Sequence, residues 1–377
     1  MTFRHGGCLY LAETYVISED LRLGRLGTVT LAVGYEDIAE LAAPFRRELL
    51  AHCYRMLGSV HDAEDAVQET MVRAWQGRTG FQGRASLRVW LYRIATNVCL
   101  RVLERRARLP MPSALGAPSH DPESRPVRSS PEVRWLEPAP DALLGGVAAD
   151  RPGGTFGAAA GPAPDPAAVV ALRAGVRLAF ISALQLLPAR QRAALILRDV
   201  LAFSAQETAV VLQSTTAAVN SALQRARTQI AAAAPAEDDV LEPSEPEVRQ
   251  QLDRYLRAFE DADVDGLLRL LRDDVVLEMP PMAAWFRGRA DVGRFLAANV
   301  LVQAGRFRNF RVGANLQPGF AAYELEADGV YHAHGLQVVT VTRTGISRID
   351  AFLDPSLFPV FGMPMSFREA PDLHSRD

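Results

Sequence analysis

The stretch at residues 204–230, SAQETAVVLQSTTAAVNSALQRARTQI, predicts two short helices joined by a tight turn. Ser204 and Glu207 form a capping box, in which each side chain satisfies a free backbone N–H at the start of the first helix. The break falls at residues 213–215, because Ser and Thr hydroxyls bond the nearby backbone in turns and N-caps. The second helix carries an apolar stripe for packing, formed by Val219, Ala222, Leu223, Ala226 and Ile230.

The opposite face of the second helix is polar and has arginines beside it. Its residues are Thr215, Thr216, Ala217, Asn220, Ser221 and Gln224, flanked by Arg225 and Arg227. Small polar groups read base edges in the DNA major groove, and arginines hold phosphates. A surface helix pair in an ordinary bundle has a similar pattern, so this stretch alone leaves both interpretations open.

Positive charge is concentrated in two parts of the chain, although the whole chain has a net charge of −3. Residues 44–108 hold 12 arginines against 6 acidic residues, and residues 172–232 hold 7 arginines against 2. Two basic modules indicate that the chain binds a polyanion. The length of 377 residues predicts two to three domains.

The composition argues against metal, cofactor and membrane functions. Cys8, Cys53 and Cys99 have neither metal-ligand spacing nor a disulfide framework. No apolar run reaches about 18 residues, and the first residues lack the charged-then-apolar pattern of a signal peptide. We therefore expect a cytoplasmic protein without a metal ion, a cofactor or a membrane partner.

Residues 36–108 have a helical pattern with an unusual outward stripe. The third predicted helix, residues 86–109, carries Trp90, Arg93, Asn97, Arg101 and Arg105 at spacings of three and four. An exposed Trp among cations and an amide is one way to hold unstacked single-stranded DNA. The alternative is that Trp90 packs into the core and that the arginines are only solvated.

Two long segments resemble a known family. FRRELLAHCYRMLGSVHDAEDAVQETMVRAW and WLYRIATN resemble region 2 of extracytoplasmic function (ECF) sigma factors, within residues 36–108. LPARQRAALILRDVLAFSAQETAVVL with AAVNSALQRAR resembles region 4, within residues 171–234. The resemblance implies two all-α domains: a region 2 helical bundle and a region 4 helix-turn-helix.

The resemblance also implies partners and site residues. Core RNA polymerase would bind through its β′ clamp helices and its β flap, and promoter DNA would bind both modules. The β′ contact would use Asp62, Asp65, Gln68, Glu69, Arg73 and Trp75. The −10 element would contact Phe81, Arg84, Trp90, Arg93, Asn97, Arg101 and Arg105. The −35 element would contact the polar face at residues 215–227.

Other segments have the composition of linkers. Residues 1–35 lack periodicity and receive no function. Residues 109–170 contain 12 of the 24 prolines and 7 glycines, a composition that does not bury enough surface to offset chain entropy. One island, VRWLEPAPDALL at residues 133–144, is less random, and we expect it to dock on the C-terminal domain or the polymerase. Residues 235–247 form a short acidic linker.

Residues 248–370 predict an α+β cone. Helical patterns at residues 248–271 and 291–302 surround a strand at residues 275–279. Three extended runs follow at residues 307–315, 321–331 and 336–352. The order resembles SnoaL-like domains of the nuclear-transport-factor-2-like superfold. LEMPPMAAWFRGRADVGRFL and AFLDPSLFPVFGMP resemble the domain fused to one sigma-factor subgroup, in which it is implied to control sigma activity.

Six residues are candidates for a pocket in this cone: Glu278, Trp285, Arg287, His332, His334 and Asp350. Enzymes of this superfold use carboxylates in apolar pockets as acids or bases. The two histidines share a strand face but lack a third metal ligand. We expect no enzymatic activity here, but rather a small ligand or a docking role, since fold does not imply function.

Three functions are compared. A sigma factor uses both basic modules and the polymerase. A ligand-responsive helix-turn-helix regulator that does not act as sigma leaves residues 63–108 without a purpose. A cone-fold isomerase or hydrolase with accessory DNA-binding helices leaves most of the chain unexplained. The first interpretation is therefore favoured.

Overall fold

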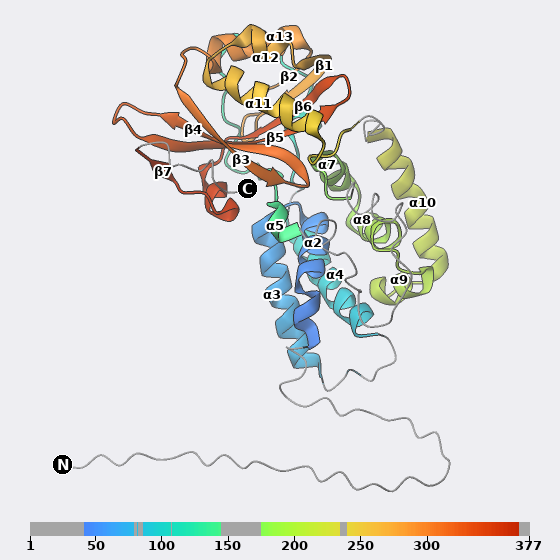
Figure 1. Cartoon of the computed structure of the whole chain (residues 1–377). Helices are drawn as coiled ribbons and strands as arrows, with labels where there is room; N and C mark the ends of the chain where they lie inside the picture. The colour runs from blue at the N-terminus through green and yellow to red at the C-terminus, as the bar shows by residue number, and fades with distance from the viewer. Residues whose placement is uncertain are drawn as a thin grey trace, which may run out of the picture.

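The structure is a computed structural model that describes residues 41–78, 81, 86–106, 108–144, 175–233 and 240–368. The described chain forms two helical modules beneath a sheet-containing cone domain (Figure 1). The predictions for residues 1–35, Cys8, Arg84 and residues 145–170 lie outside the described residues.

The first helical module consists of α2 (Arg46–Leu57), α3 (Val60–Gly77) and α4 (Leu87–Arg105), preceded by the 3₁₀ turn η1 (Ala43–Phe45). Gly58 ends α2 with φ 75°, a conformation that a residue without Cβ adopts at low cost. Ser59 and Ser86 accept backbone N–H groups at the starts of α3 and α4. The three predicted helices are confirmed.

The second helical module consists of α7 (Leu178–Leu186), α8 (Ala189–Leu195), the π turn η4 (Ile196–Val200), α9 (Ala205–Leu212) and α10 (Thr216–Ala233). The capping box between Ser204 and Glu207 is present. Gln213 takes a left-handed conformation with φ 51° and makes the turn between α9 and α10. Val219, Leu223 and Ala226 are buried, so the apolar stripe of α10 is confirmed.

The two helical modules pack directly against each other, with α4 in contact with α8 and α9. The ring of Phe203, just before α9, lies 5.0 Å from that of Tyr92 on α4. Arg192 of α8 is buried and donates to the carbonyl of Met56 on α2. Arg55, also buried, donates through Nε to the carbonyl of Gly175 at 2.9 Å. Buried cations that bond backbone carbonyls across an interface specify its geometry.

The cone domain has a mixed sheet covered by helices. Its helices are α11 (Pro246–Glu260), α12 (Val264–Leu268), α13 (Arg289–Phe295), the π turn η5 (Leu296–Val300) and the 3₁₀ helix η6 (Pro355–Phe361). Its strands are β1 (Leu271–Glu278), β2 (Trp285–Arg287), β3 (Phe307–Ala314), β4 (Gln317–Leu325), β5 (Tyr331–Thr342), β6 (Gly345–Phe352) and β7 (Ser366–Phe367). The strand order is β2-β1-β6-β5-β4-β3, with β7 paired to β5. Only β1 and β6 pair in parallel among these described strands.

The α+β cone is confirmed, but two predicted extended runs are wrong in their bounds. The run at residues 336–352 is a hairpin of β5 and β6, because Gly345 takes φ 128° and reverses the chain. The run at residues 321–331 is replaced by β4, which begins at Gln317 and ends at Leu325. The alternating Val and Thr residues of β5 clearly predicted a strand, whereas the turn between β5 and β6 had a weaker sequence pattern.

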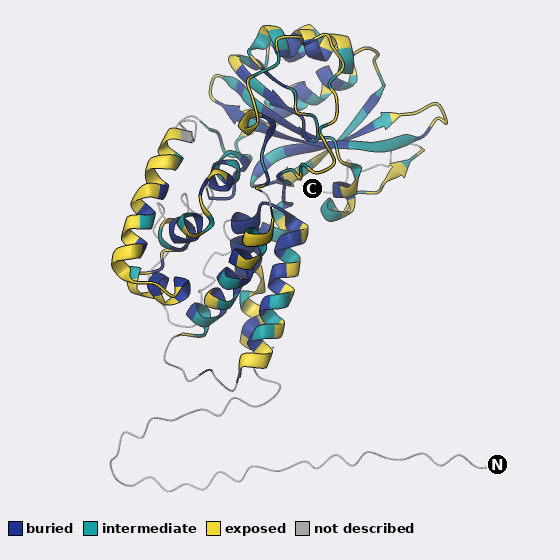
Figure 2. Cartoon of the chain, turned by 180° about the vertical axis from the view of Figure 1, so that it is seen from behind, coloured by how far each residue is buried: buried dark blue, intermediate teal, exposed yellow. Residues whose placement is uncertain are grey.

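The sheet is buried on both faces by different parts of the chain. Its inner face packs under α11, α12 and α13 and forms one apolar cluster with them. Its outer face, including Leu336, Val338 and Phe352, belongs to the same apolar cluster as the two helical modules. The layers are visible from behind in Figure 2, where buried residues continue from the sheet into the helices. The cone domain and the helical modules therefore share a core.

Residues 108–144, here called the connecting segment, correct the linker prediction. Leu109, Met111, Leu136 and Leu144 are buried, so this stretch does bury apolar surface despite its prolines. It contains η3 (Pro112–Ala114) and the short helix α5 (Asp141–Leu144), which contacts both α2 and β3 (Figure 1). The composition argument fails because neighbouring domains supply the apolar partners that the segment itself lacks.

Candidate functional site

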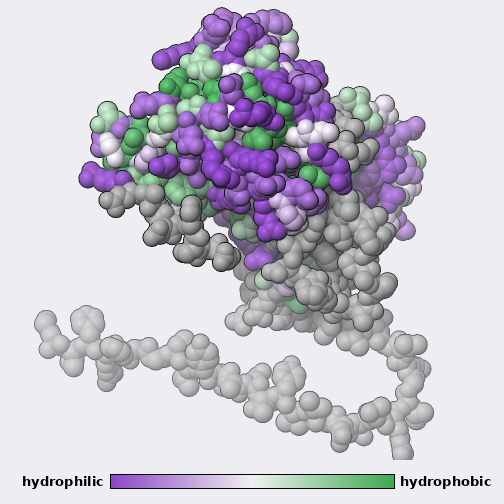
Figure 3. Space-filling model, turned by 45° about the horizontal axis from the view of Figure 1, so that its top comes forward, coloured by the Kyte–Doolittle hydropathy of each residue, from purple (hydrophilic) through white to green (hydrophobic). Residues whose placement is uncertain are grey.

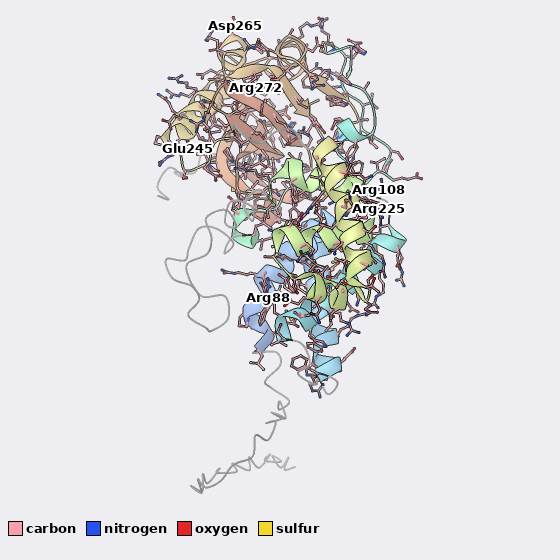
Figure 4. The ribbon with its side chains drawn as sticks, turned by 90° about the vertical axis from the view of Figure 1, so that its right-hand side faces the viewer. Arg88, Arg108, Arg225, Glu245, Asp265 and Arg272 are labelled. Carbon is pink, nitrogen blue, oxygen red and sulfur yellow. The ribbon has the colours of Figure 1, made fainter. Side chains whose placement is uncertain are left out.

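The polar face of α10 is open. All eight predicted −35 residues, from Thr215 to Arg227, are exposed. Arg225 donates to the Ser221 hydroxyl at 2.6 Å, and it lies on the outer helix of the second module in Figure 4. Arg227 makes two hydrogen bonds to Asp199, at 2.8 and 2.7 Å. The helix therefore presents small polar groups with one arginine already oriented by a carboxylate.

The outward stripe of α4 is only partly open. Arg93, Arg101 and Arg105 are exposed, whereas Trp90 is half-buried. The Trp90 ring lies 5.1 Å from that of Phe81, which precedes the helix. The ring of Trp90 thus packs against Phe81 and is only partly exposed, and a role in binding single-stranded DNA stays a prediction.

The second helical module covers one end of this stripe. A shallow groove is lined by Asn97, Arg101 and Glu104 of α4 on one side. Pro188, Arg190 and Gln213 line it on the other side. Nearer the start of α4, the guanidinium of Arg88 lies 4.5 Å from the Phe203 ring centroid. The outward stripe of α4 and the polar face of α10, the two candidate DNA surfaces, therefore lie on modules that pack directly against each other.

The outer side of α3 offers a second surface. Asp65, Gln68 and Glu69 line a groove between α3 and α4, and Trp75 is 47% exposed. Asp62 also lines this groove, but it is buried and its carboxylate bonds Arg106 and Arg134 of the connecting segment. Its carboxylate is therefore occupied within the chain.

Sequence reasoning missed Val72 on the same surface. Val72 is 50% exposed and lines the groove with Glu69. Its signal was available, since Val72 falls outside the apolar stripe of α3, and an apolar residue on a polar helix face indicates a contact. Glu69 is held by an ion pair with Arg73 one turn later.

The inner face of the cone encloses a cavity of about 370 Å³. Of the six predicted pocket residues, His334 lines it, so the prediction is wrong for Glu278, Trp285, Arg287, His332 and Asp350. The physical reason is strand alternation: Leu277 and Ile349 face the cavity, and each is next to a carboxylate that points the other way.

Glu278, Arg348 and Asp350 form a buried cluster on the outer face. The Arg348 guanidinium donates to Glu278 at 2.6 Å and to Asp350 at 2.9 Å. The backbone N–H of Ser113, from the connecting segment, donates to Glu278 at 3.3 Å. Burial raises the pKa of Asp350 to about 6, against the opposing effect of Arg348. This cluster anchors the connecting segment and does not face the cavity.

Two of the other displaced candidates, Trp285 and His332, also have structural partners. The indole N–H of Trp285 donates to the carbonyl of Gly116 at 2.9 Å. His332 lies 3.0 Å from Asp328, on the rim of the sheet, and Arg287 is exposed. Trp285 thus binds the connecting segment, as Glu278 does.

Polar groups that the sequence did not single out line the cavity. Gln337 accepts a hydrogen bond from the Tyr255 hydroxyl at 2.7 Å. Arg306 binds Glu324 at 2.6 Å, and Glu324 binds Nδ1 of His334 at 2.9 Å. The hydrogen bond from His334, aided by Arg306, lowers the pKa of Glu324 to about 2. Among the described residues no group of His, Cys, Asp or Glu is arranged to hold a metal ion.

Family comparisons now identify the modules. Residues 41–109 match the sigma-70 region 2 family, residues 177–230 match sigma-70 region 4, and residues 252–354 match the SnoaL-like domain family. The chain is 44% identical to the ECF RNA polymerase sigma factor SigG of Mycobacterium tuberculosis over 332 residues, which are 88% of this chain and 85% of that protein.

The chain belongs to the ECF sigma factors. It is also 27% identical to the ECF sigma factor SigJ of M. tuberculosis over 348 residues, covering 89% of this chain and 96% of SigJ. The crystal structure of SigJ aligns with a TM-score of 0.51 and 22% identity, over 87% of this chain and 99% of that one. The last comparison supports the shared fold of modules and cone domain.

Sigma factors bind core RNA polymerase and promoter DNA, and the two basic modules of this ECF sigma factor correspond to regions 2 and 4. The cone domain is its SnoaL-like domain. Within the described ranges, no helix is long and apolar enough to cross a membrane.

Proposed function

We propose that this sigma factor directs transcription initiation through three surfaces. The α3 surface with Trp75 and Val72 binds the β′ clamp helices, and the second module binds the β flap. The Phe81 loop and α4 recognise the −10 element, and the exposed face of α10 reads the −35 element. The exposure of the polar residues on α10 and of the arginines on α4 supports these assignments.

We further propose that the arrangement described above is a restrained state. The −10 and −35 elements are separated by about 25 base pairs, which is roughly 85 Å of B-DNA at 3.4 Å per pair. We infer that two modules held together at Phe203 and Tyr92 have to separate before both elements are bound. Promoter binding therefore requires α8 and α9 to leave α4.

The cone domain supplies the restraint. Asn315, in the turn between β3 and β4, bonds Tyr54 of the first module and the carbonyl of Val176 before the second. The backbone of Ala139 exchanges two hydrogen bonds of 2.9 Å with Asn315. Domains that share such a buried polar junction with an apolar cluster separate only at a free-energy cost. The proposed role of the cone domain is thus regulatory, without catalysis.

The experiment is run-off transcription with core RNA polymerase on a library of promoters. A sigma role predicts transcripts that require both the protein and a matched pair of −35 and −10 elements. The protein alone should leave duplex DNA unprotected in a footprint. Transcripts absent under all conditions, together with a footprint from the protein alone, would indicate a helix-turn-helix regulator instead.

A further inference from the structure

The cone cavity has a polar end that a β-bulge creates. Side chains alternate between faces along a strand, so His334 and Gln337, three positions apart, should point to opposite faces of β5. The register between β4 and β5 shifts between Ala322 and Tyr323, and His334 has no cross-strand partner there. The extra residue resets the alternation, and both side chains line the cavity.

Each of these two side chains has one hydrogen-bonding atom to spare. His334 uses Nδ1 on Glu324 at 2.9 Å, which leaves Nε2. Gln337 uses its amide oxygen on the Tyr255 hydroxyl at 2.7 Å, which leaves the amide nitrogen. Neither remaining atom has a partner among the described residues. The amide nitrogen donates, and a histidine ring nitrogen that carries no proton accepts.

The rest of the cavity wall is largely apolar. Its aromatic members are Tyr255, Phe259, Phe295 and Phe307, and Leu277 and Ile349 lie on the sheet side. An apolar pocket of a few hundred Å³ with a small number of convergent polar groups is the usual form of a small-molecule site. The face of the cone domain seen in Figure 3 is mostly hydrophilic with some hydrophobic patches, and Phe259, Phe295 and Phe307 belong to the buried apolar cluster of this domain.

We propose that this cavity binds a compact apolar molecule that carries one hydroxyl group. A hydroxyl accepts one hydrogen bond and donates another, which matches the amide nitrogen of Gln337 and Nε2 of His334. A ring system of one or two rings fits the volume of about 370 Å³ and the aromatic wall.

The connecting segment forms part of the cavity wall. Arg125 and Pro126 line the cavity, within a stretch at residues 116–129 that we call the rim segment. Asn299, another lining residue, donates to the carbonyl of Pro122 at 3.2 Å. Met282, also lining, pairs with Arg128 in a β-bridge. A bound molecule would therefore contact the rim segment as well as the cone.

The same segment then continues to the first helical module. Glu137 accepts from the backbone N–H of Val60 at 3.0 Å, and its carbonyl accepts from the Tyr54 hydroxyl at 2.8 Å. Ligand binding thereby stabilises the rim segment and, through it, the restrained arrangement. The effect on transcription rests on the function proposed above, whereas binding itself does not.

The test uses the full chain and 2-naphthol, a two-ring apolar molecule with one hydroxyl. Isothermal titration should give saturable binding at one site per chain, and 2-methoxynaphthalene, which cannot donate, should bind more weakly. Ala322→Leu places a larger side chain in the cavity wall, which reduces the cavity volume, and should weaken 2-naphthol binding about tenfold or more. Ala297→Leu, exposed and outside the lining, is the matched control and should bind normally.

A second variant guards against misfolding. Ala298→Trp at the exposed edge of the cavity should also weaken binding, without change in the buried wall. Amide hydrogen exchange across residues 116–129 should slow when 2-naphthol binds. Absence of 2-naphthol binding, or binding unaffected by both cavity variants, would overturn the site.

Binding without slower exchange at residues 116–129 would overturn the role of the rim segment. Neither isothermal titration nor amide hydrogen exchange requires RNA polymerase. Failure of this site is therefore distinguishable from failure of the proposed restraint, which only transcription measures.

Discussion

The side-chain amide of Asn315 lies 2.9 Å from the hydroxyl of Tyr54, although the two residues are 261 positions apart in the chain. The same amide donates to the carbonyl of Val176 at 2.7 Å, and its oxygen accepts from the backbone of Ala139 at 2.9 Å. One buried side chain thus contacts the first module, the connecting segment and the start of the second module. Its left-handed backbone, with φ 57°, suits Asn and the β3–β4 turn.

Replacing Asn315 with Gly should loosen this junction. Glycine accepts φ 57° without strain, so the variant removes the hydrogen bonds and keeps the turn. Buried groups of Ala139 and Val176 lose their partner, at a cost of about 1–3 kcal/mol. Amide hydrogen exchange at residues 134–144 should become faster.

Asn309→Ala is the control for that variant. Asn309 lies in β3, the strand that leads into the turn at Asn315. Its side-chain nitrogen has no hydrogen-bond partner among the described residues. Its loss should leave exchange at residues 134–144 unchanged. Equal exchange rates in Asn315→Gly and the unaltered chain would contradict the role of Asn315.

Asn220→Ala should relax the preference for the −35 sequence. Asn220 is exposed on α10, and one good base contact contributes about 1–3 kcal/mol of discrimination. The check is transcription by the holoenzyme from promoters with single −35 substitutions. Gln229→Ala, exposed further along α10, should keep the original preference; unchanged selectivity in both variants would argue against this orientation of the helix.

Arg225→Ala should weaken promoter binding by a similar factor on every sequence. A phosphate contact carries no base information, and its loss lowers the slope of log affinity against log salt by about one. Holoenzyme binding measured over a salt series gives this slope. A loss confined to one promoter sequence would instead assign Arg225 to a base.

Asp141→Asn should stabilise the protein at neutral pH. Burial raises the pKa of Asp141 to about 6, against the backbone N–H of Leu316, which favours the ionised form. The folded state therefore binds a proton more tightly than the unfolded state. Stability from this group is greatest below about pH 4 and is lost as the pH rises through about 6.

The neutral Asn side chain keeps an oxygen for the Leu316 N–H and removes the buried charge. Two pKa units correspond to about 3 kcal/mol; because Asp141 is partly solvated, we expect a gain of order 1 kcal/mol at pH 7.5. The thermal midpoints of variant and parent should converge near pH 4. Asp261→Asn, at the exposed end of α11, is the control and should show no such convergence.

Local signals predicted the helices and the exposed face of α10 well. The capping box at Ser204, the αL glycine at Gly58 and the stripe through Val219 depend on residues within a few positions of one another. All the residues that determine these features lie close together in the sequence, so the sequence alone is enough to predict them. The exposed face of α10 follows from the burial of the opposite stripe.

Long-range partners explain the failures. Asp62 was expected to contact the β′ clamp helices, and the sequence did not show that its carboxylate also bonds Arg134, 72 positions away. The linker composition of residues 109–132 hid their burial, since their apolar partners lie in other domains. The docking expected for residues 133–144 on the C-terminal domain is present, with the Leu316 N–H donating to Asp141. Glu278 was wrongly placed in the pocket with His334, which does line it, because face assignment depends on strand register, and the bulge in β5 has no clear local signature.

The most direct test of the restraint compares the unaltered chain with Asn315→Gly in run-off transcription with core RNA polymerase. Both proteins should be used at equal concentration on a promoter selected with the unaltered chain, with Asn309→Ala in parallel. We expect more transcript from Asn315→Gly, with the same start site, and parental output from Asn309→Ala. Equal or lower output from a folded Asn315→Gly protein would contradict a restraining role for the cone domain.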